Sequence, residues 1–198
     1  FFLLFSLLGG ISKADFNILQ AMEMDKKNNL KLLERSPGHF SLFLNREPDI
    51  LYSSEYLNLF TFKTGGPEWR CLSEAIYFEG RGESLHGQFA IAEVVVNRMQ
   101  HPRFPDTVCG VVKQGGVKKH RCQFSYMCDG RFEQIKETDA FNRAGRIAEI
   151  ILNGAQKNLT DGSTFYHNEN VSPAWSKELT FVEKIGRHRF YKYSTAQN

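Results

Sequence analysis

The chain of 198 residues carries 25 lysines and arginines against 22 aspartates and glutamates, a net charge of +3, and 41% of its residues are hydrophobic. This length favours one domain with an additional segment, and the composition is sufficient for a real core. The small charge excludes the dense lysine and arginine patterns of dedicated nucleic-acid binders, so we expect no nucleic-acid partner. It is compatible with an anionic polymer such as a cell wall, and equally with a chain that has no anionic partner.

Residues 1–14 are predicted to be the remnant of a secretory signal. Residues 1–8 are almost wholly apolar but far shorter than a membrane span of roughly 20 residues, and Ser12-Lys13-Ala14 follows the small-x-small pattern of a cleavage site. We therefore expect a mature protein that begins near Asp15, has no stable membrane span and acts in the periplasm or cell wall. A buried terminus or a retained membrane anchor is the alternative. Residues 15–66 are polar, weakly patterned and interrupted by prolines, which predicts a linker or cover segment.

A first helix is predicted from Pro67, which fits the first helical turn, and Glu68 favours the positive end of the helix dipole. Gly80 and Gly82 stop or bend this helix. Four side chains share one face at helical spacing: Leu72, Ala75, Ile76 and Glu79.

Further elements follow in order. A second helix, from about Leu85 to Gln100, is apolar on most sides and is expected to be central; two prolines in residues 101–106 end it. A third is predicted over residues 138–153, with Thr138 and Asp139 as caps. Residues 163–167 predict a strand, and residues 179–185 and 188–193 a hairpin with Gly186-Arg187 as its turn. The expected class is α+β, with helices first and a small antiparallel sheet near the C-terminus.

The four cysteines form an even set, which in an oxidising compartment indicates disulfides with three possible connectivities. We expect Cys122 to pair with Cys128 and Cys71 with Cys109. The alternative is a metal site built from Cys122, Cys128, His120 and His101, but this spacing matches no standard zinc pattern, and we expect no metal and no cofactor.

Two glutamates, Glu79 and Glu83, stand at the glycine-rich break between the first two helices. Glu79 continues an apolar stripe, and burial of such a carboxyl group raises its pKa. A protonated carboxyl group is what cleavage of a glycosidic bond requires, because the leaving oxygen must receive a proton. Two glutamates near a helix end can equally be a solvated surface, so spacing alone does not decide.

Five ordered blocks of sequence carry a resemblance: IYFEGRGE, HGQFAIAEVVVNRM, FPDTVCGVV, RCQFSYMCDG, and STFYHNENVSPAW followed by IGRHRFYK. Together they resemble the SleB/CwlJ-type cell wall hydrolase family over residues 68–193. The resemblance implies a lysozyme-like helical core within a catalytic domain over residues 67–198. It also implies cleavage of peptidoglycan between N-acetylmuramic acid and N-acetylglucosamine, carried out in characterised members by lytic transglycosylation.

The first glutamate of the family's E-x-R-G-E block is its acid/base, and this position falls on Glu79. Ring closure by the sugar's own 6-hydroxyl needs no second carboxylate, so Glu83 would be structural or substrate-positioning, whereas a plain hydrolase would use Glu83 as its second carboxylate. Gly80 replaces the alanine usual in this block. The further candidates for substrate contact or for bracing the site are Gln88, Asn97, Gln123, Phe124, Ser125, Tyr166 and His167.

Two rival functions remain open at this stage. A cysteine amidase or peptidase acting on wall peptides would use Cys122 as nucleophile and His120 or His167 as base. A catalytically silent module would only bind peptidoglycan. In each case the expected partner is peptidoglycan, and we expect a monomer.

Overall fold

The computed structural model describes residues 52, 54–58, 64–116, 122, 124–128, 130, 133–154 and 158–194. The chain divides into two compact units, residues 1–59 and 60–198. In the first unit the described residues include one short helix, α3 (Ser54–Asn58). The predicted signal remnant lies outside the described residues, and the predicted segments 15–66 and 67–198 stay predictions.

Three helices form the body of the second unit: α4 (Pro67–Gly80), α5 (Leu85–Gln100) and α7 (Thr138–Leu152). Helix α4 begins with Pro67 and Glu68, and α5 is capped by Ser84, whose side chain accepts a hydrogen bond from the Gly87 N–H. The predicted bounds of the first two helices are confirmed. The predicted caps of the third are wrong, because its N-cap residue is Glu137.

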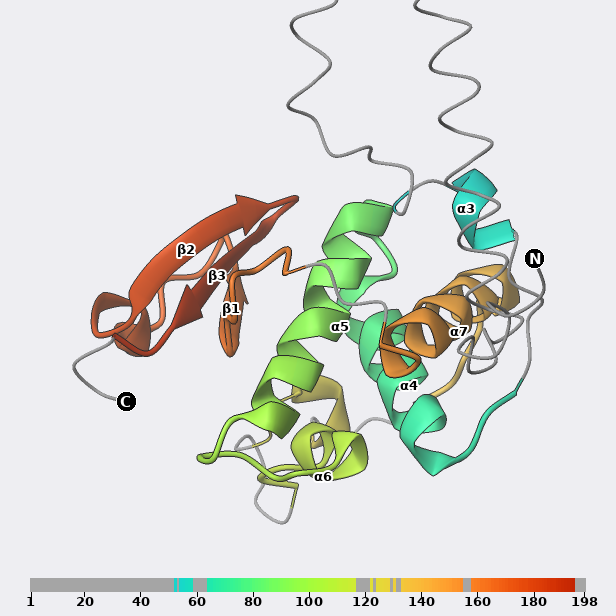
Figure 1. Cartoon of the computed structure of the whole chain (residues 1–198), viewed down its shortest axis with the longest axis horizontal. Helices are drawn as coiled ribbons and strands as arrows, with labels where there is room; N and C mark the ends of the chain where they lie inside the picture. The colour runs from blue at the N-terminus through green and yellow to red at the C-terminus, as the bar shows by residue number, and fades with distance from the viewer. Residues whose placement is uncertain are drawn as a thin grey trace, which may run out of the picture. The chain divides into compact units, whose positions relative to one another are not determined.

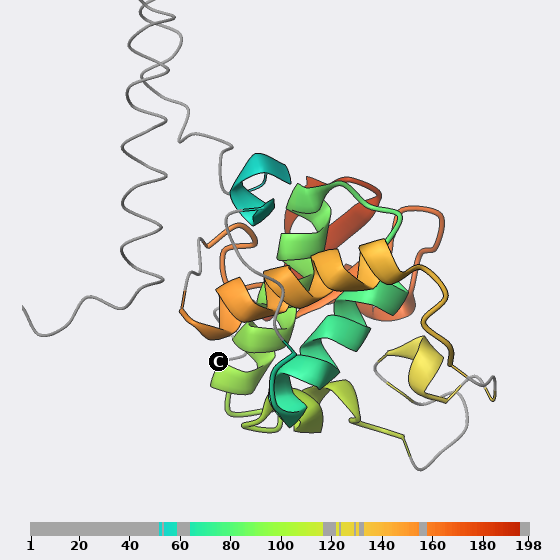
Figure 2. The same ribbon diagram turned by 90° about the vertical axis from the view of Figure 1, so that its right-hand side faces the viewer.

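Helix α5 is central, as expected. It lies between the sheet on one side and α4 and α7 on the other (Figure 1), and Figure 2 shows α7 lying across α4 and α5. Of the α5 residues Phe89 to Val96, all are buried. Trp69 joins α4 to α7, because its indole N–H donates to the Gly145 carbonyl at 2.8 Å.

The sheet contains β1 (Phe165–Asn168), β2 (Thr180–Ile185) and β3 (His188–Lys192), all antiparallel, in the spatial order β1-β3-β2. The predicted turn is present, with Gly186 at φ 58°. Ile185 and Phe190 from the sheet pack on Ala90 and Val94 of α5. This contact fixes the hairpin on the central helix.

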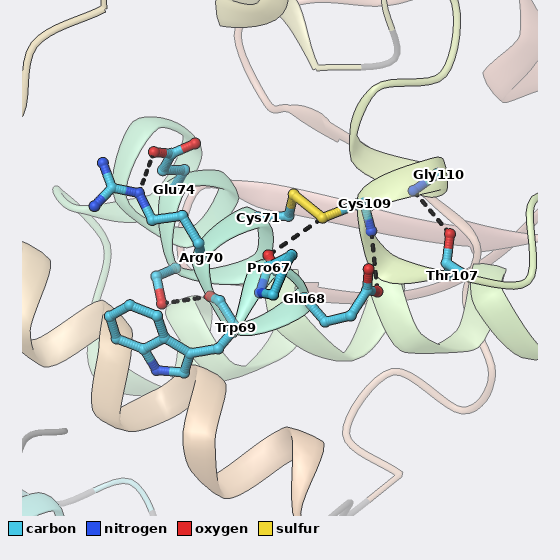
Figure 3. The surroundings of a disulfide bond; sticks show 10 residues. Pro67, Glu68, Trp69, Arg70, Cys71, Glu74, Thr107, Cys109 and Gly110 are labelled. Atoms are coloured by element: carbon cyan, nitrogen blue, oxygen red, sulfur yellow. Dashed lines mark hydrogen bonds and ion pairs between the residues drawn. A yellow bond between two sulfur atoms is a disulfide. The ribbon is translucent and has the colours of Figure 1, made fainter. Parts of the chain in front are cut away.

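Three shorter elements complete the described fold: α6 (Val108–Val112) and the 3₁₀ turns η3 (Ser125–Met127) and η4 (Ala174–Lys177). Both predicted disulfides are present, Cys71–Cys109 and Cys122–Cys128. Figure 3 shows how the first joins α4 to α6, where the Glu68 carboxylate also accepts a hydrogen bond from the Cys109 N–H at 3.2 Å.

Candidate active site

Glu79 lies in the last turn of α4, on the same face as Leu72, Ala75 and Ile76. Those three side chains have no exposed surface, whereas Glu79 is half-buried. The stripe predicted from helical spacing is therefore real, and Glu79 stands where it reaches the surface.

Three polar side chains, the buried Tyr126 and Arg98 and the partly buried Tyr166, lie within electrostatic range of the Glu79 carboxylate. Burial raises the pKa of Tyr166 well above its ordinary value, and the Glu79 charge raises it further. Burial also raises the pKa of Tyr126, with smaller contributions from Glu74 and Glu79. Burial lowers the pKa of Arg98 to about 10, an effect that Glu79 partly opposes. The charge of Glu79 therefore acts on two tyrosine hydroxyls and on one buried cation.

Arg98 is fully buried near the end of α5. Its Nε donates to the Thr164 carbonyl at 2.5 Å, and its guanidinium carbon lies 5.3, 5.8 and 5.7 Å from the ring centroids of Phe104, Phe124 and Phe165. Such cation–π contacts stabilise a cation away from water. The sequence analysis did not single out Arg98; the available signal was an arginine on a helix that is apolar on most sides.

Arg81, two residues after Glu79, turns toward the start of α7. Its Nε lies 3.4 Å from the Glu137 carboxylate, and its guanidinium lies 5.1 Å from the Tyr77 ring. The Tyr77 hydroxyl accepts hydrogen bonds from the N–H groups of Lys136 and Glu137, both at 3.2 Å. The junction after α4 is thereby attached to the N-terminus of α7.

Glu83 has a separate partner, Arg187 in the turn of the β2–β3 hairpin. Its Oε1 accepts from Arg187 Nε at 2.8 Å, and its Oε2 accepts from the Arg187 backbone N–H at 3.1 Å. The Glu83 side chain is only 4% exposed, and His188 Nδ1 lies 3.8 Å from Oε1. Both carboxylate oxygens of Glu83 are therefore engaged by the hairpin.

Three glycines leave room for this pair. A Cβ at Gly186 would lie 2.4 Å from Glu83 Oε2, one at Gly82 would lie 3.2 Å from Arg187 Nη2, and one at Gly87 would lie 3.0 Å from Glu83 Cβ. Only glycine permits so close an approach at Gly186, whose φ is also positive. The glycines around the predicted site thus serve the packing of Glu83.

Gly80, the departure from the family block, packs against α5. A Cβ there would lie 2.8 Å from Ile91 Cδ1 and 3.6 Å from Gln88 Cγ. Gln88 is itself buried, its Nε2 donates to the Glu83 carbonyl at 3.0 Å, and its Oε1 has no hydrogen-bond partner among the described residues. Gln88 therefore lies beside the segment that follows Glu79.

Asn97 is held by the loop that leads into β1. Its amide donates to Thr160 Oγ1 at 3.3 Å and to the Ser163 carbonyl at 3.0 Å. One turn earlier, the buried Glu93 accepts hydrogen bonds from Leu159 N–H and from the N–H and hydroxyl of Thr160. Asn97 thus has the bracing contacts that were one of its two expected roles, and Glu93 is a further brace that the sequence did not single out.

Tyr166 and His167 point to opposite faces of the sheet. Tyr166 packs with Phe190 on the face that meets α5 and lies within electrostatic range of Glu79. His167 stacks on Tyr191 on the other face, where its Nε2 lies 3.0 Å from the Tyr191 hydroxyl. Only Tyr166 shares the Glu79 side of the sheet.

The remaining candidates come from the cysteine-containing loop. Phe124 is 1% exposed and its ring faces Arg98. Gln123 and the side chain of Ser125 lie outside the described residues, as does His120.

Cys122 is bonded to Cys128, so it has no thiol to act as a nucleophile and neither sulfur is available as a thiolate ligand. The disulfide therefore overturns both the cysteine amidase hypothesis and the alternative of a metal site at Cys122 and Cys128. Where the structure describes the chain, no group of three or more histidine, cysteine or acidic side chains could hold a metal ion, and no helix is long and apolar enough to cross a membrane.

Comparisons with known proteins all find enzymes that act on the cell wall or the spore cortex. Residues 82–191 match the family described as Cell Wall Hydrolase, a range that begins just after Glu79. Spore cortex-lytic enzymes are similar: that of Halalkalibacterium halodurans is 31% identical over 60% of this chain and 33% of its own length, and that of Bacillus subtilis is 31% identical over 61% and 36%. The chain thus spans about a third of the length of these relatives.

Two solved structures are similar in fold and sequence. The catalytic domain of the germination-specific lytic transglycosylase SleB from Bacillus anthracis superposes with a TM-score of 0.51 and 27% identity, over 67% of this chain and all of that domain. The SleB catalytic domain from Bacillus cereus gives 0.50 and 28%, over 67% of this chain and 98% of that one. The helical body with its small sheet is therefore the fold of these domains.

Proposed function

This chain belongs to the cell wall hydrolase family, and from that premise we propose that it is a peptidoglycan lytic transglycosylase with Glu79 as its acid/base. The bond cleaved is that between N-acetylmuramic acid and N-acetylglucosamine. The observation that carries the proposal is the position of Glu79 in the last turn of α4, where it is half-buried and within electrostatic range of Tyr126, Tyr166 and Arg98. Glu83, the second carboxylate nearby, has both of its oxygens bound by the hairpin.

The proposed reaction uses one carboxyl group twice. Glu79 first donates a proton to the glycosidic oxygen, which leaves with the N-acetylglucosamine side of the strand. The resulting carboxylate then removes the proton of the muramic acid 6-hydroxyl, whose oxygen attacks the anomeric carbon. The product is a 1,6-anhydro ring, and Glu79 is protonated again. The B. anthracis neighbour is a lytic transglycosylase, which supports this chemistry over hydrolysis.

Hydrolysis is the second candidate within this class. It would require Glu83 to activate a water or to attack the sugar as the second carboxylate. A glutamate whose oxygens already accept two hydrogen bonds from Arg187, and whose side chain is 4% exposed, is poorly placed for either task. We therefore propose that Glu83 is structural, that the buried Gln88 braces the segment after Glu79, and that the partly buried Tyr166 is the nearest candidate for substrate contact.

The rest of the proposal concerns where the protein acts. We propose that residues 67–198 are the catalytic domain, that the protein is exported to the periplasm or cell wall, that peptidoglycan is its partner and that it works as a monomer. A module that only binds the wall would pellet with peptidoglycan without releasing product.

The test is a digest of purified peptidoglycan, analysed by mass spectrometry, with the wild type and Glu79→Gln. Glutamine keeps the size of the side chain but cannot exchange a proton, so we expect products ending in anhydromuramic acid from the wild type and a loss of at least about a hundredfold in the variant. Glu178→Gln, an exposed substitution, is the control. Products with reducing ends would establish hydrolysis instead, and full activity of Glu79→Gln would refute the assignment.

A further inference from the structure

We propose that Arg187, in the turn of the β2–β3 hairpin, is a positioning residue for Glu79 and acts through the carboxylate of Glu83. The inference rests on the proposed function of Glu79. The sheet lies beside α5 (Figure 1). Its β2–β3 turn contributes Arg187, which would give the sheet a role in the reaction.

The geometry links Arg187 to Glu79 through a short, closed segment. Residues 80–83 form a turn in which the Glu83 N–H donates to the Gly80 carbonyl at 2.9 Å, directly after the helix that carries Glu79. Arg187 holds the far end of this turn at three points: both Glu83 oxygens, and the Gly82 carbonyl, which accepts from Nη2 at 3.3 Å. The guanidinium makes two of these bonds, to Glu83 Oε1 and to the Gly82 carbonyl, and the Arg187 backbone N–H makes the third, to Glu83 Oε2. Charge-assisted bonds from one side chain to two acceptors of the turn fix its direction as well as its distance.

Burial makes this link asymmetric. The Glu83 side chain is 4% exposed, whereas that of Arg187 is 57% exposed. Removal of Arg187 would leave a buried carboxylate without its cation, which is strongly unfavourable, and the turn would move to expose it. Neutralisation of Glu83 would leave the Arg187 guanidinium without its carboxylate, but this cation is largely exposed and water would solvate it. Loss of Arg187 should therefore disturb the turn more than loss of the Glu83 charge.

The hairpin offers a matched control two residues away. Arg189 is exposed in β3, and its guanidinium lies 5.9 Å from the Phe181 ring. An effect of general charge or of strand stability would appear in Arg189→Ala as well.

The experiment compares Arg187→Ala, Glu83→Gln, the double variant and Arg189→Ala by two measurements. The first is the rate of anhydro-product formation on soluble peptidoglycan strands as a function of strand concentration. We expect Arg187→Ala to lower kcat by about ten- to a hundredfold with KM nearly unchanged, because a small displacement of a catalytic group costs this much. Glu83→Gln should lower kcat less, and in the double variant it should partly restore the rate lost in Arg187→Ala.

The second measurement is hydrogen exchange in the peptide that spans residues 79–84, which needs no activity. Exchange should be faster in Arg187→Ala and unchanged in Arg189→Ala. Unchanged exchange in Arg187→Ala, equal rate losses in the two arginine variants, or a raised KM with an unaltered kcat would overturn the inference; the last would make Arg187 a substrate contact. If the wild type forms no product, the proposed function fails, and the exchange measurement alone decides whether Arg187 holds the turn.

Discussion

Glu79, Arg81 and Glu83 lie within five residues of one another, but their side chains have separate surroundings. Glu79 lies within electrostatic range of Tyr166 and Arg98, Arg81 reaches the start of α7, and Glu83 binds the hairpin turn. The last turn of α4 and the short break after it therefore carry the proposed acid/base and two attachments, one to α7 and one to the hairpin. The surroundings differ because the chain turns between α4 and α5 and presents successive residues to different elements.

His188, the neighbour of Arg187, makes stability depend on pH. Burial lowers its pKa below the ordinary value of 6.5, and this outweighs the opposing effect of Glu83. As the pH falls below 6.5, the unfolded chain therefore binds a proton before the folded protein does. The contribution of neutral His188 is complete above this pH and decreases as the pH falls toward the lowered pKa of the folded state.

We therefore expect the free energy of unfolding to fall as the pH is lowered from about 7 to about 5, with a smaller decrease in His188→Gln, whose side chain does not titrate. The measurement is urea denaturation at several pH values in this range. Parallel profiles for the wild type and His188→Gln would show that another group is responsible.

At the scale of elements, α5 both fills the core and holds the segment that leads into the sheet. Its polar residues Glu93, Asn97 and Arg98 bind successive parts of the segment from Leu159 to Thr164, which leads into β1 and Tyr166. These bonds set where β1 begins, and thus where Tyr166 stands relative to Glu79.

Replacement of Glu93 by alanine tests this role. It leaves three donors in a buried region without an acceptor, so we expect a loss of at least about 3 kcal/mol in the free energy of unfolding. The exposed Glu178→Ala should change it by less than about 0.5 kcal/mol. Urea denaturation of both variants measures this difference in the free energy of unfolding. If Glu93→Ala lowered it as little as Glu178→Ala, water would have taken the place of the Glu93 carboxylate as the acceptor for the three donors.

At the scale of the whole molecule, the two disulfides differ in the length of chain that they close. Cys71–Cys109 closes 38 residues and joins α4 to α6, whereas Cys122–Cys128 closes only 6. The loss of chain entropy in the unfolded state grows with the length of the loop, so the longer bridge should contribute more.

Paired cysteine-to-alanine variants should reveal this difference. We expect a loss of about 4 kcal/mol without Cys71–Cys109 and about 2 kcal/mol without Cys122–Cys128. Denaturant unfolding of each double variant under oxidising conditions measures both. A larger loss from the short bridge would show that native contacts around η3, rather than chain entropy, dominate.

Local sequence signals predicted much of this molecule. Pro67 and Glu68 mark the start of α4, the glycines after Glu79 mark its end, and the glycine at 186 marks the hairpin turn. These signals are local, because helix starts, helix ends and tight turns depend on a few adjacent residues. The five-residue helix α6, hidden in a loop with glycine and cysteine, and the N-cap at Glu137 were missed because such short features depend on contacts with other elements.

By itself, the sequence determined the order and type of the main elements, because periodicity and turn residues are properties of the chain. It also indicated the disulfide partners among three possible connectivities, and the resemblance of its ordered blocks indicated Glu79 as the candidate acid/base. Only the tertiary structure decided what each polar residue contacts. It placed Tyr166 on the Glu79 side and His167 on the other, gave both oxygens of Glu83 to Arg187, and surrounded the buried Arg98 with rings. Glu83 and Arg187 are separated by 104 residues in the chain. No local signal connects them; their contact exists because α5 and the hairpin pack together.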